Sequence, residues 1–169
     1  MIASLRGTVL SKTDESLVLE VGGVGYKVFA TPGTLARLAL LSEGVLLYIE
    51  ESFAMYGGGA ALYGFLTTNE QAMFLTFREN IPSTGAKKAL EYLEKASKSL
   101  PDFRRAILEK DGRILAGVFG FTKKTSDKII DALKDKIDGL SISGAEKLLR
   151  SSEENLSSTA LSQALNALS

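Results

Sequence analysis

The first 65 residues alternate between apolar and polar positions with a period of two, which is typical of β-strands with one buried face. Leu17, Leu19 and Val21 show the alternation most clearly. It predicts five strands in all, one before a polar hairpin loop at 11–15 and the others around 17–21, 26–30, 45–50 and 60–65. The glycine-rich segment 22–25 has turn chemistry and connects the second strand to the third.

Thr31 followed by Pro32 has the form of an N-cap with proline at the first helical position, so a short helix is predicted over residues 32–40. Five short strands with a small helix between the third and the fourth predict a small β-barrel of the OB-fold type over residues 1–65. A fragment of a β-sandwich is the alternative.

Helical spacing replaces the alternation at Phe65. Five helix starts are indicated by Thr67 with Glu70, by Gly85, by Ser99 with Asp102, by Asp111 and by Thr122. The last helix is expected to run to Asp138, with Gly139 as its stop. Residues 66–140 are therefore predicted to form an all-α domain with two helix-hairpin-helix motifs. Its first helix carries Phe74 and Phe77, which are expected in the core and not on a base-stacking platform.

The chain after residue 140 turns serine-rich. Residues 141–159 are predicted to be a linker, so the chain would end in a flexible tail. Leu161, Ala164, Leu165 and Leu168 then fall at helical spacing. Because one helix cannot bury its own apolar face, residues 160–169 are expected to start a further helical domain that is truncated here.

The chain contains neither cysteine nor histidine. Their absence excludes a disulfide framework, a cysteine- or histidine-based metal site and a Ser-His-Asp enzyme. The sequence has no Walker-type loop for ATP, no apolar run long enough to cross a bilayer and no signal peptide. A cytoplasmic protein without a metal or a cofactor is therefore predicted. Twenty basic residues balance twenty acidic ones, but the basic excess lies in residues 67–138.

Two turns carry the candidate chemistry, because each combines glycine with lysines at a predicted helix start. Backbone N–H groups exposed at such a turn form a site for an anion, and lysines beside them suit a phosphate. The plainer alternative is two capped helix starts with solvated lysines. The candidate phosphate-binding residues are Gly85, Lys87 and Lys88 in the weaker first turn, and Gly120, Lys123, Lys124 and Thr125 in the second.

Three stretches of the chain resemble the RuvA family of Holliday-junction branch-migration subunits, at residues 1–7, 19–28 and 62–65. Residues 123–125 and 133–136 also match the second helix-hairpin-helix motif of that family in order and spacing. The resemblance is continuous over about residues 1–140, and the final residues are similar to the start of the family's third domain.

The resemblance implies a non-catalytic subunit that forms a homotetramer and holds four-way junction DNA flat on one face during recombination and DNA repair. A hexameric ATPase motor, RuvB, would drive branch migration, and the junction resolvase RuvC is a further expected partner. Carried over to this chain, the phosphate contacts fall on the candidate residues above. Lys88 is the exception, because its position is usually apolar in the family.

The chain departs from the family at both turns and in one hairpin. The family has a Gly-x-Gly pattern in each turn, whereas this chain has Ser83 before Gly85 and Thr122 after Gly120. An added Cβ can disallow a positive φ, so weaker or rearranged phosphate contacts are expected. The family also has an acidic pair that forms a pin at the junction centre. Gly57 and Gly58 occupy those positions here, so the charged pin is expected to be absent.

Two other functions stay open from the sequence. The altered turns and missing pin would suit an assembly adaptor that recruits the motor but grips DNA weakly. A barrel that binds single-stranded nucleic acid is the weaker option, because residues 1–66 carry an excess of acidic residues and few aromatic ones at alternating strand positions.

Overall fold

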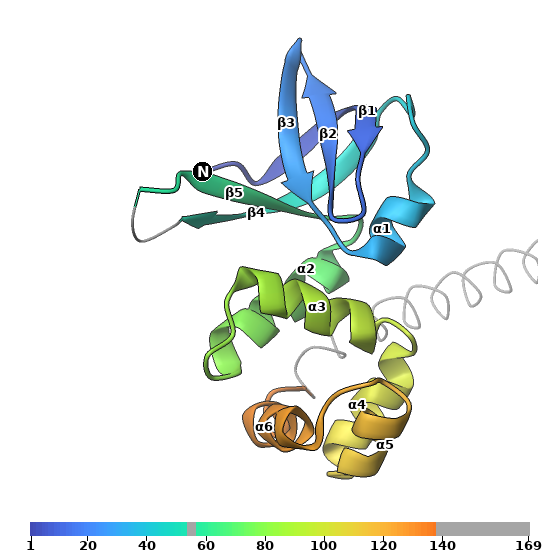
Figure 1. Ribbon diagram of the computed structural model, residues 1–169, viewed down its shortest axis with the longest axis vertical. Coiled ribbons are helices and arrows are strands. Elements are labelled where there is room, and N and C mark those ends of the chain that lie inside the picture. The colour runs from blue at the N-terminus through green and yellow to red at the C-terminus, as the bar shows by residue number, and fades with distance from the viewer. Residues whose placement is uncertain (54–56, 138–169) are drawn as a thin grey trace, which may run out of the picture. The chain divides into compact units, whose positions relative to one another are not determined.

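The computed structural model describes residues 1–53 and 57–137, and its barrel and helices form one compact unit, Met1–Lys134. The five strands close into a barrel in the order β1-β2-β3-β5-β4 (Figure 1). Neighbouring strands are antiparallel except β3 and β5, which pair in parallel. The closed barrel confirms the OB-fold prediction, and the sandwich alternative is wrong. The strands are β1 (Ser4–Lys12), β2 (Ser16–Val21), β3 (Val24–Phe29), β4 (Val45–Phe53) and β5 (Ala60–Phe65).

The strands extend further into the predicted loops than the sequence indicates. The β1–β2 loop begins after Lys12, and the β2–β3 turn consists of Gly22 and Gly23 alone, both with positive φ. Val24 already pairs with Val21, so segment 22–25 is not a loop throughout. Two-residue turns with positive φ match the twist of an antiparallel pair, and glycine adopts that backbone without strain.

A short helix, α1 (Pro32–Arg37), begins as predicted but ends earlier than residue 40. The Thr31 hydroxyl accepts a hydrogen bond from the Thr34 N–H and caps the start. At the other end, the Lys12 ammonium of β1 donates hydrogen bonds to the carbonyls of Leu35 and Leu38. The Leu35 carbonyl also accepts the N–H of the C-cap residue Leu38, and the lysine adds a donor to both carbonyls at the point where the helix stops.

Five further helices confirm the predicted all-α region, and their starts lie where the capping residues indicate. The hydroxyls of Thr67 and Thr122 and the carboxylate of Asp111 each accept a backbone N–H bond at a helix start. Ser99 differs, because its hydroxyl donates to the Asp102 carboxylate instead of capping a backbone N–H. The helices are α2 (Thr68–Asn80), α3 (Ala86–Ala96), α4 (Leu100–Leu108), α5 (Gly112–Gly117) and α6 (Lys123–Leu133).

The last helix is shorter than the sequence pattern predicts. α6 ends at Leu133, with Lys134 as its C-cap, and does not run on to Asp138. Asp138 and the expected stop at Gly139 lie outside the described residues, as do the predicted linker and the start of a third domain. Within the described residues, no helix is long and apolar enough to span a membrane.

Phenylalanine rings fill the core of the helical region and join it to the barrel. Phe74 and Phe77 are fully buried, which confirms their predicted core role. Phe77 meets Phe103 edge to face at a centroid distance of 5.8 Å. Phe74 lies 4.9 Å from Phe65 and 5.6 Å from Tyr63, both at the end of β5. The first helix of the helical region is thereby packed directly against the last strand of the barrel.

Candidate nucleic-acid interface

The two predicted turns have the same backbone course, although their sequences differ. The first joins α2 to α3, and the second joins α5 to α6. Ser83 and Gly120 occupy matching positions, and both have positive φ, at 56° and 77°. Gly85 and Thr122 match in turn, since each is the extended N-cap residue of the helix that follows. The chain therefore presents one hairpin geometry twice.

Both turns form although each lacks one glycine of the family pattern. Ser83 adopts the left-handed conformation in place of glycine, with the strain that a Cβ brings there. Thr122 needs no such conformation, because its φ is −68°. Its hydroxyl instead accepts a hydrogen bond from the Thr125 N–H at 3.2 Å. Both substitutions are accommodated, and the expectation of weaker phosphate contacts stays a prediction.

The two helix starts differ in how many N–H groups they leave open. The first N–H groups of any helix have no partner within it. Gly85 has no side chain with which to cap α3, so the N–H groups of Ala86, Lys87 and Lys88 meet no acceptor within the described structure. In α6, Thr122 already binds the N–H of Thr125. The first hairpin therefore offers more open N–H groups to an anion.

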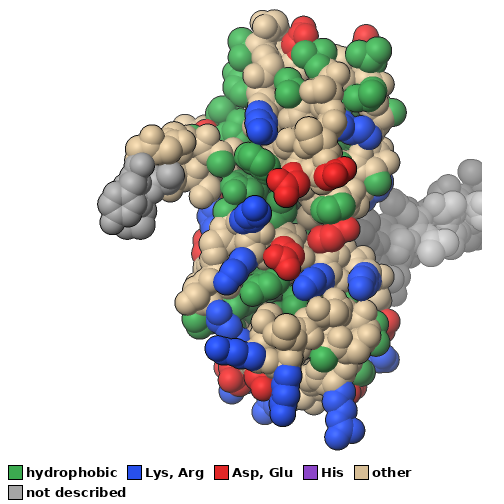
Figure 2. Space-filling model, viewed as in Figure 1, with side chains coloured by type: hydrophobic (Ala, Val, Ile, Leu, Met, Phe, Trp, Pro, Cys, Tyr) green, Lys and Arg blue, Asp and Glu red, His purple; other side chains and the backbone are tan. Residues whose placement is uncertain are grey.

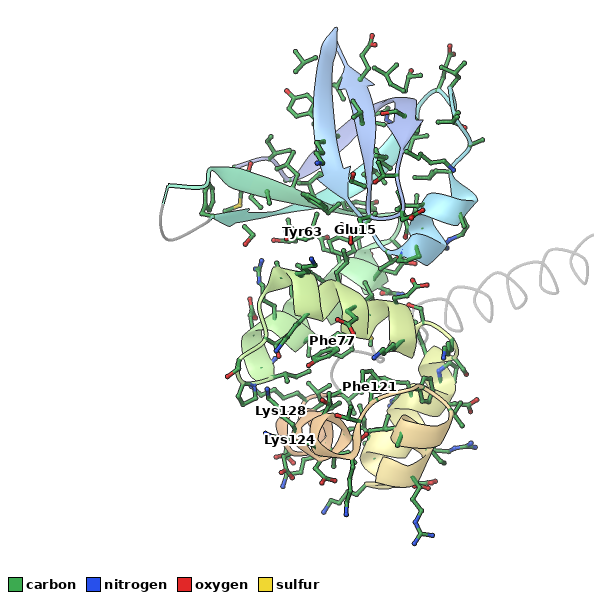
Figure 3. The ribbon with its side chains drawn as sticks, in the orientation of Figure 1. Glu15, Tyr63, Phe77, Phe121, Lys124 and Lys128 are labelled. Carbon is green, nitrogen blue, oxygen red and sulfur yellow. The ribbon has the colours of Figure 1, made fainter. Side chains whose placement is uncertain are left out.

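The second hairpin offers more lysines. Lys87 of α3 and Lys124 of α6 are exposed and occupy matching positions. One helical turn later, Glu91 in α3 is matched by Lys128 in α6, and the sequence analysis did not single out Lys128. Figure 3 shows Lys124 and Lys128 together on α6. Their spacing of one helical turn is the signal that could have identified Lys128.

Lys123 and Lys124 have different surroundings, although they are neighbours in sequence. Lys123 lines a shallow hollow in which the basic side chains of Lys110 and Arg113 accompany the carboxylates of Glu109, Asp111 and Asp127. The charges in this hollow are therefore balanced, and Lys123 and Lys124 are both exposed. Lys128 is half-buried, whereas Lys87 is exposed. Lys88 is exposed on α3, and Thr125, its counterpart on α6, is half-buried.

Comparison with known proteins decides the family. Residues 1–64 match the family model described as the RuvA N-terminal domain. The chain is 46% identical over 150 residues to the Holliday junction branch migration complex subunit RuvA of Elusimicrobium minutum, covering 88% of this chain and 72% of that relative. It is 41% identical over 169 residues to the protein of the same name from Endomicrobium trichonymphae, covering 99% and 82%. The protein so named from Rickettsia prowazekii is 32% identical over 168 residues, covering 99% and 79%. The chain belongs to the RuvA family.

The hairpin that holds the expected pin positions joins β4 to β5. Gly57 and Gly58 lie in its loop, and residues 54–56 are outside the described part. Glu50 and Glu51 lie lower in the strand pair, opposite Tyr63 and Leu62. Glu50 accepts a hydrogen bond from the Gln71 amide at 2.8 Å, and Glu51 accepts one from the Ile2 N–H at 3.0 Å. Both carboxylates are therefore hydrogen-bonded within the fold, and the expected absence of a charged pin stays a prediction.

A cleft of about 460 Å³ lies where α3 meets the barrel, with Phe29, Tyr63 and Leu90 among its apolar lining. Burial raises the pKa of the Tyr63 phenol above its ordinary value, and the nearby Arg78 guanidinium partly offsets that rise. More acidic than basic side chains surround the cleft, namely Asp14, Glu15, Glu91 and Glu94 against Lys87 and Lys95. This balance disfavours a phosphate chain along the barrel.

Basic side chains are concentrated on the helical part of the molecule. In Figure 2, lysines and arginines gather over the lower, helical part of this face, and several acidic groups lie across its middle. The residues described contain no group of three or more acidic side chains that could hold a metal ion. The pair of hairpins is therefore a better candidate surface for nucleic acid than the barrel.

Proposed function

We propose that this chain is the junction-binding subunit of a Holliday junction branch migration complex and performs no catalysis itself. The observation that supports the proposal is the pair of matching turns, each with open helix N-terminal N–H groups beside exposed lysines. Contacts of this kind hold a phosphate backbone without reading base sequence. A protein that recognises DNA by its four-way shape needs such contacts.

The proposed assembly is a homotetramer on the junction in the cytoplasm. One copy supplies two hairpins, which suit the backbone of one duplex arm, so four arms require four copies. ATP-driven movement would come from a hexameric motor, RuvB, because the chain has no Walker-type loop. The resolvase RuvC is the further proposed partner. Mass measurement with and without a junction tests this assembly, and a monomer that persists on the junction would contradict it.

A gel-shift titration tests junction recognition itself. The protein is titrated against a four-way junction and a linear duplex of the same sequences at several salt concentrations. We expect tighter binding to the junction and a steep loss of affinity with salt, because phosphate contacts release counterions. Equal affinity for both DNAs at every salt concentration would rule the proposal out.

Replacement of the hairpin lysines tests the contact residues. We expect Lys123→Ala with Lys124→Ala to weaken binding equally for all sequences. Removal of one lysine–phosphate contact should lower the slope of log affinity against log salt by about 1. Lys27→Ala, on the barrel, is the matched control. Unchanged affinity in the double variant would favour the adaptor that recruits the motor without gripping DNA.

A further inference from the structure

Two lysines near the C-terminus of α3 reach the backbone of the second hairpin turn. The Lys95 ammonium donates a hydrogen bond to the Gly120 carbonyl at 3.3 Å, and the Lys98 ammonium donates one to the Val118 carbonyl at 3.5 Å. The Lys95 nitrogen also lies 5.3 Å from the centroid of the Phe121 ring. Glu91, one turn earlier on α3, forms an ion pair with Lys95 at 3.5 Å. The helix that starts in the first hairpin therefore ends on the second.

These contacts fix both sides of one peptide group. The N–H of Phe121 donates to the Leu115 carbonyl of α5 at 3.1 Å. The carbonyl of the same peptide group, which belongs to Gly120, accepts from Lys95. Because a peptide group is planar, holding its N–H and its C=O fixes the orientation of the whole group. The N–H groups that follow, from Thr122 to Lys124, then leave the turn in one defined direction.

The second turn has more need of such support than the first. Gly120 has a positive φ and no side chain, so its backbone has more freedom than that of any other residue type. The first turn has Pro82 and Ser83 at the matching positions, and proline restricts its own φ. In the second hairpin, Ala132 and Asp135 occupy the positions that correspond to Lys95 and Lys98. Neither of these side chains can donate such a hydrogen bond. At these matching positions within residues 57–137, lysine occurs only on the side of the first hairpin, so the contacts described run from the first hairpin to the second.

We infer that Lys95, assisted by Lys98, is a positioning residue that couples the two hairpins by holding the Gly120 turn in the orientation that binds phosphate. The inference rests on the proposed function, since it assigns these lysines a role in the DNA grip. Under this inference, α3 contributes to the phosphate contacts of both hairpins. The first hairpin binds through the start of α3, and the second is held in place by its end.

A measurement on the free protein tests the coupling without DNA. Lys95→Met keeps most of the aliphatic stem and removes the ammonium group. We expect this variant to shift the amide resonances of Gly120, Phe121 and Thr122 and to speed their hydrogen exchange, while Lys95→Arg restores them. Lys88→Met, which removes a charge from the start of the same helix, should leave these amides unchanged. Unshifted turn amides in Lys95→Met would overturn the inference.

Junction binding then separates positioning from direct contact. We expect Lys95→Met to weaken binding several-fold with an unchanged salt slope, and Lys95→Arg to recover the affinity. Lys87→Met, eight positions earlier on α3, is the reference for a direct phosphate contact and should lower the salt slope by about 1. A lowered slope in Lys95→Met, or an unchanged affinity, would overturn the positioning role. A wild-type protein that binds junction and duplex equally would contradict the proposed function. The amide resonances and hydrogen exchange of the protein without DNA would still show whether Lys95 holds the second turn.

Discussion

Ser83 and Gly120 occupy the same left-handed position in the two turns, but only Ser83 has a side chain. Substitutions at these two residues therefore measure the free energy that a Cβ costs in this backbone conformation. We expect Gly120→Ala to lower the free energy of unfolding by about 1 kcal/mol, because a Cβ is disfavoured at a φ of 77°. Nothing lies within 4 Å of that Cβ, so no clash adds to the loss. Ser83→Gly should not destabilise the protein. Denaturant unfolding of both variants measures the difference, and equal losses would contradict the assignment.

Tyr63 should make the protein less stable in alkaline solution. Burial raises its folded-state pKa above the ordinary value of 10.0, so the unfolded chain loses the phenol proton first as the pH rises. The stability linked to this group is fully present below the ordinary pKa and is lost as the pH rises through the raised one. We expect Tyr63→Phe to lose less stability than the wild type between about pH 8 and pH 11 in denaturant unfolding. The same loss in both proteins would contradict this.

Sequence alone could not identify the residues that act at a distance. Lys124 was found because it follows a glycine turn, and the local sequence contains the whole signal. Lys95 and Lys98 lie far from Gly120 along the chain, and no local pattern links them to the second turn. Glu50 and Glu51 show the same limit, because only the fold reveals that both are already hydrogen-bonded low in the β4–β5 strand pair.

At the scale of the elements, helix starts were predictable and helix ends were not. Thr67, Asp111 and Thr122 accept backbone N–H bonds from residues two or three positions on, so their role is contained in the local sequence. The end of α1 depends on Lys12, which belongs to a strand far away in sequence. Apolar spacing also extends past Leu133 to Ile137, which is why the pattern overestimates the length of α6.

A cap added to α3 should change stability and DNA binding in opposite directions. Gly85 is the N-cap residue and forms no side-chain cap bond, whereas Thr122 forms one in the matching place. We expect Gly85→Ser to raise the free energy of unfolding by a few tenths of a kcal/mol, because its hydroxyl satisfies an open N–H group. The same bond withdraws that N–H from phosphate, so junction affinity should fall. A variant that gains both stability and affinity would show that these N–H groups do not contact DNA.

At the scale of the whole molecule, the barrel requires a close approach between β1 and β2. A Cβ at Gly7 of β1 would lie 2.0 Å from the Glu20 carbonyl oxygen of β2, and backbone cannot move aside as a side chain can. We expect Gly7→Ala to cost about 3 kcal/mol or more in denaturant unfolding. Gly117→Ala is the control, because its Cβ meets nothing within 4 Å. A cost for Gly7→Ala as small as that of the control would show that the strands can separate locally.

The closed barrel was the most predictable feature of the molecule, because five strands and one helix leave few ways to bury their apolar faces. The packing of helices against it was not predictable. Phe74 has ordinary helical spacing, and nothing in its neighbourhood shows that its ring meets Phe65 and Tyr63. Those contacts make barrel and helices one compact unit, on which the placement of both hairpins depends.

The unequal hairpins have a kinetic consequence. Once one hairpin holds a duplex arm, recapture by the other is an intramolecular event at high effective concentration. We expect the first hairpin, in which Glu91 stands where α6 has Lys128, to release sooner and to rebind many times before the arm departs. If α6 binds the backbone as proposed, the arm should remain tethered during each release while it advances. We expect such a subunit to combine long residence on the junction with a low barrier to movement of the DNA through it.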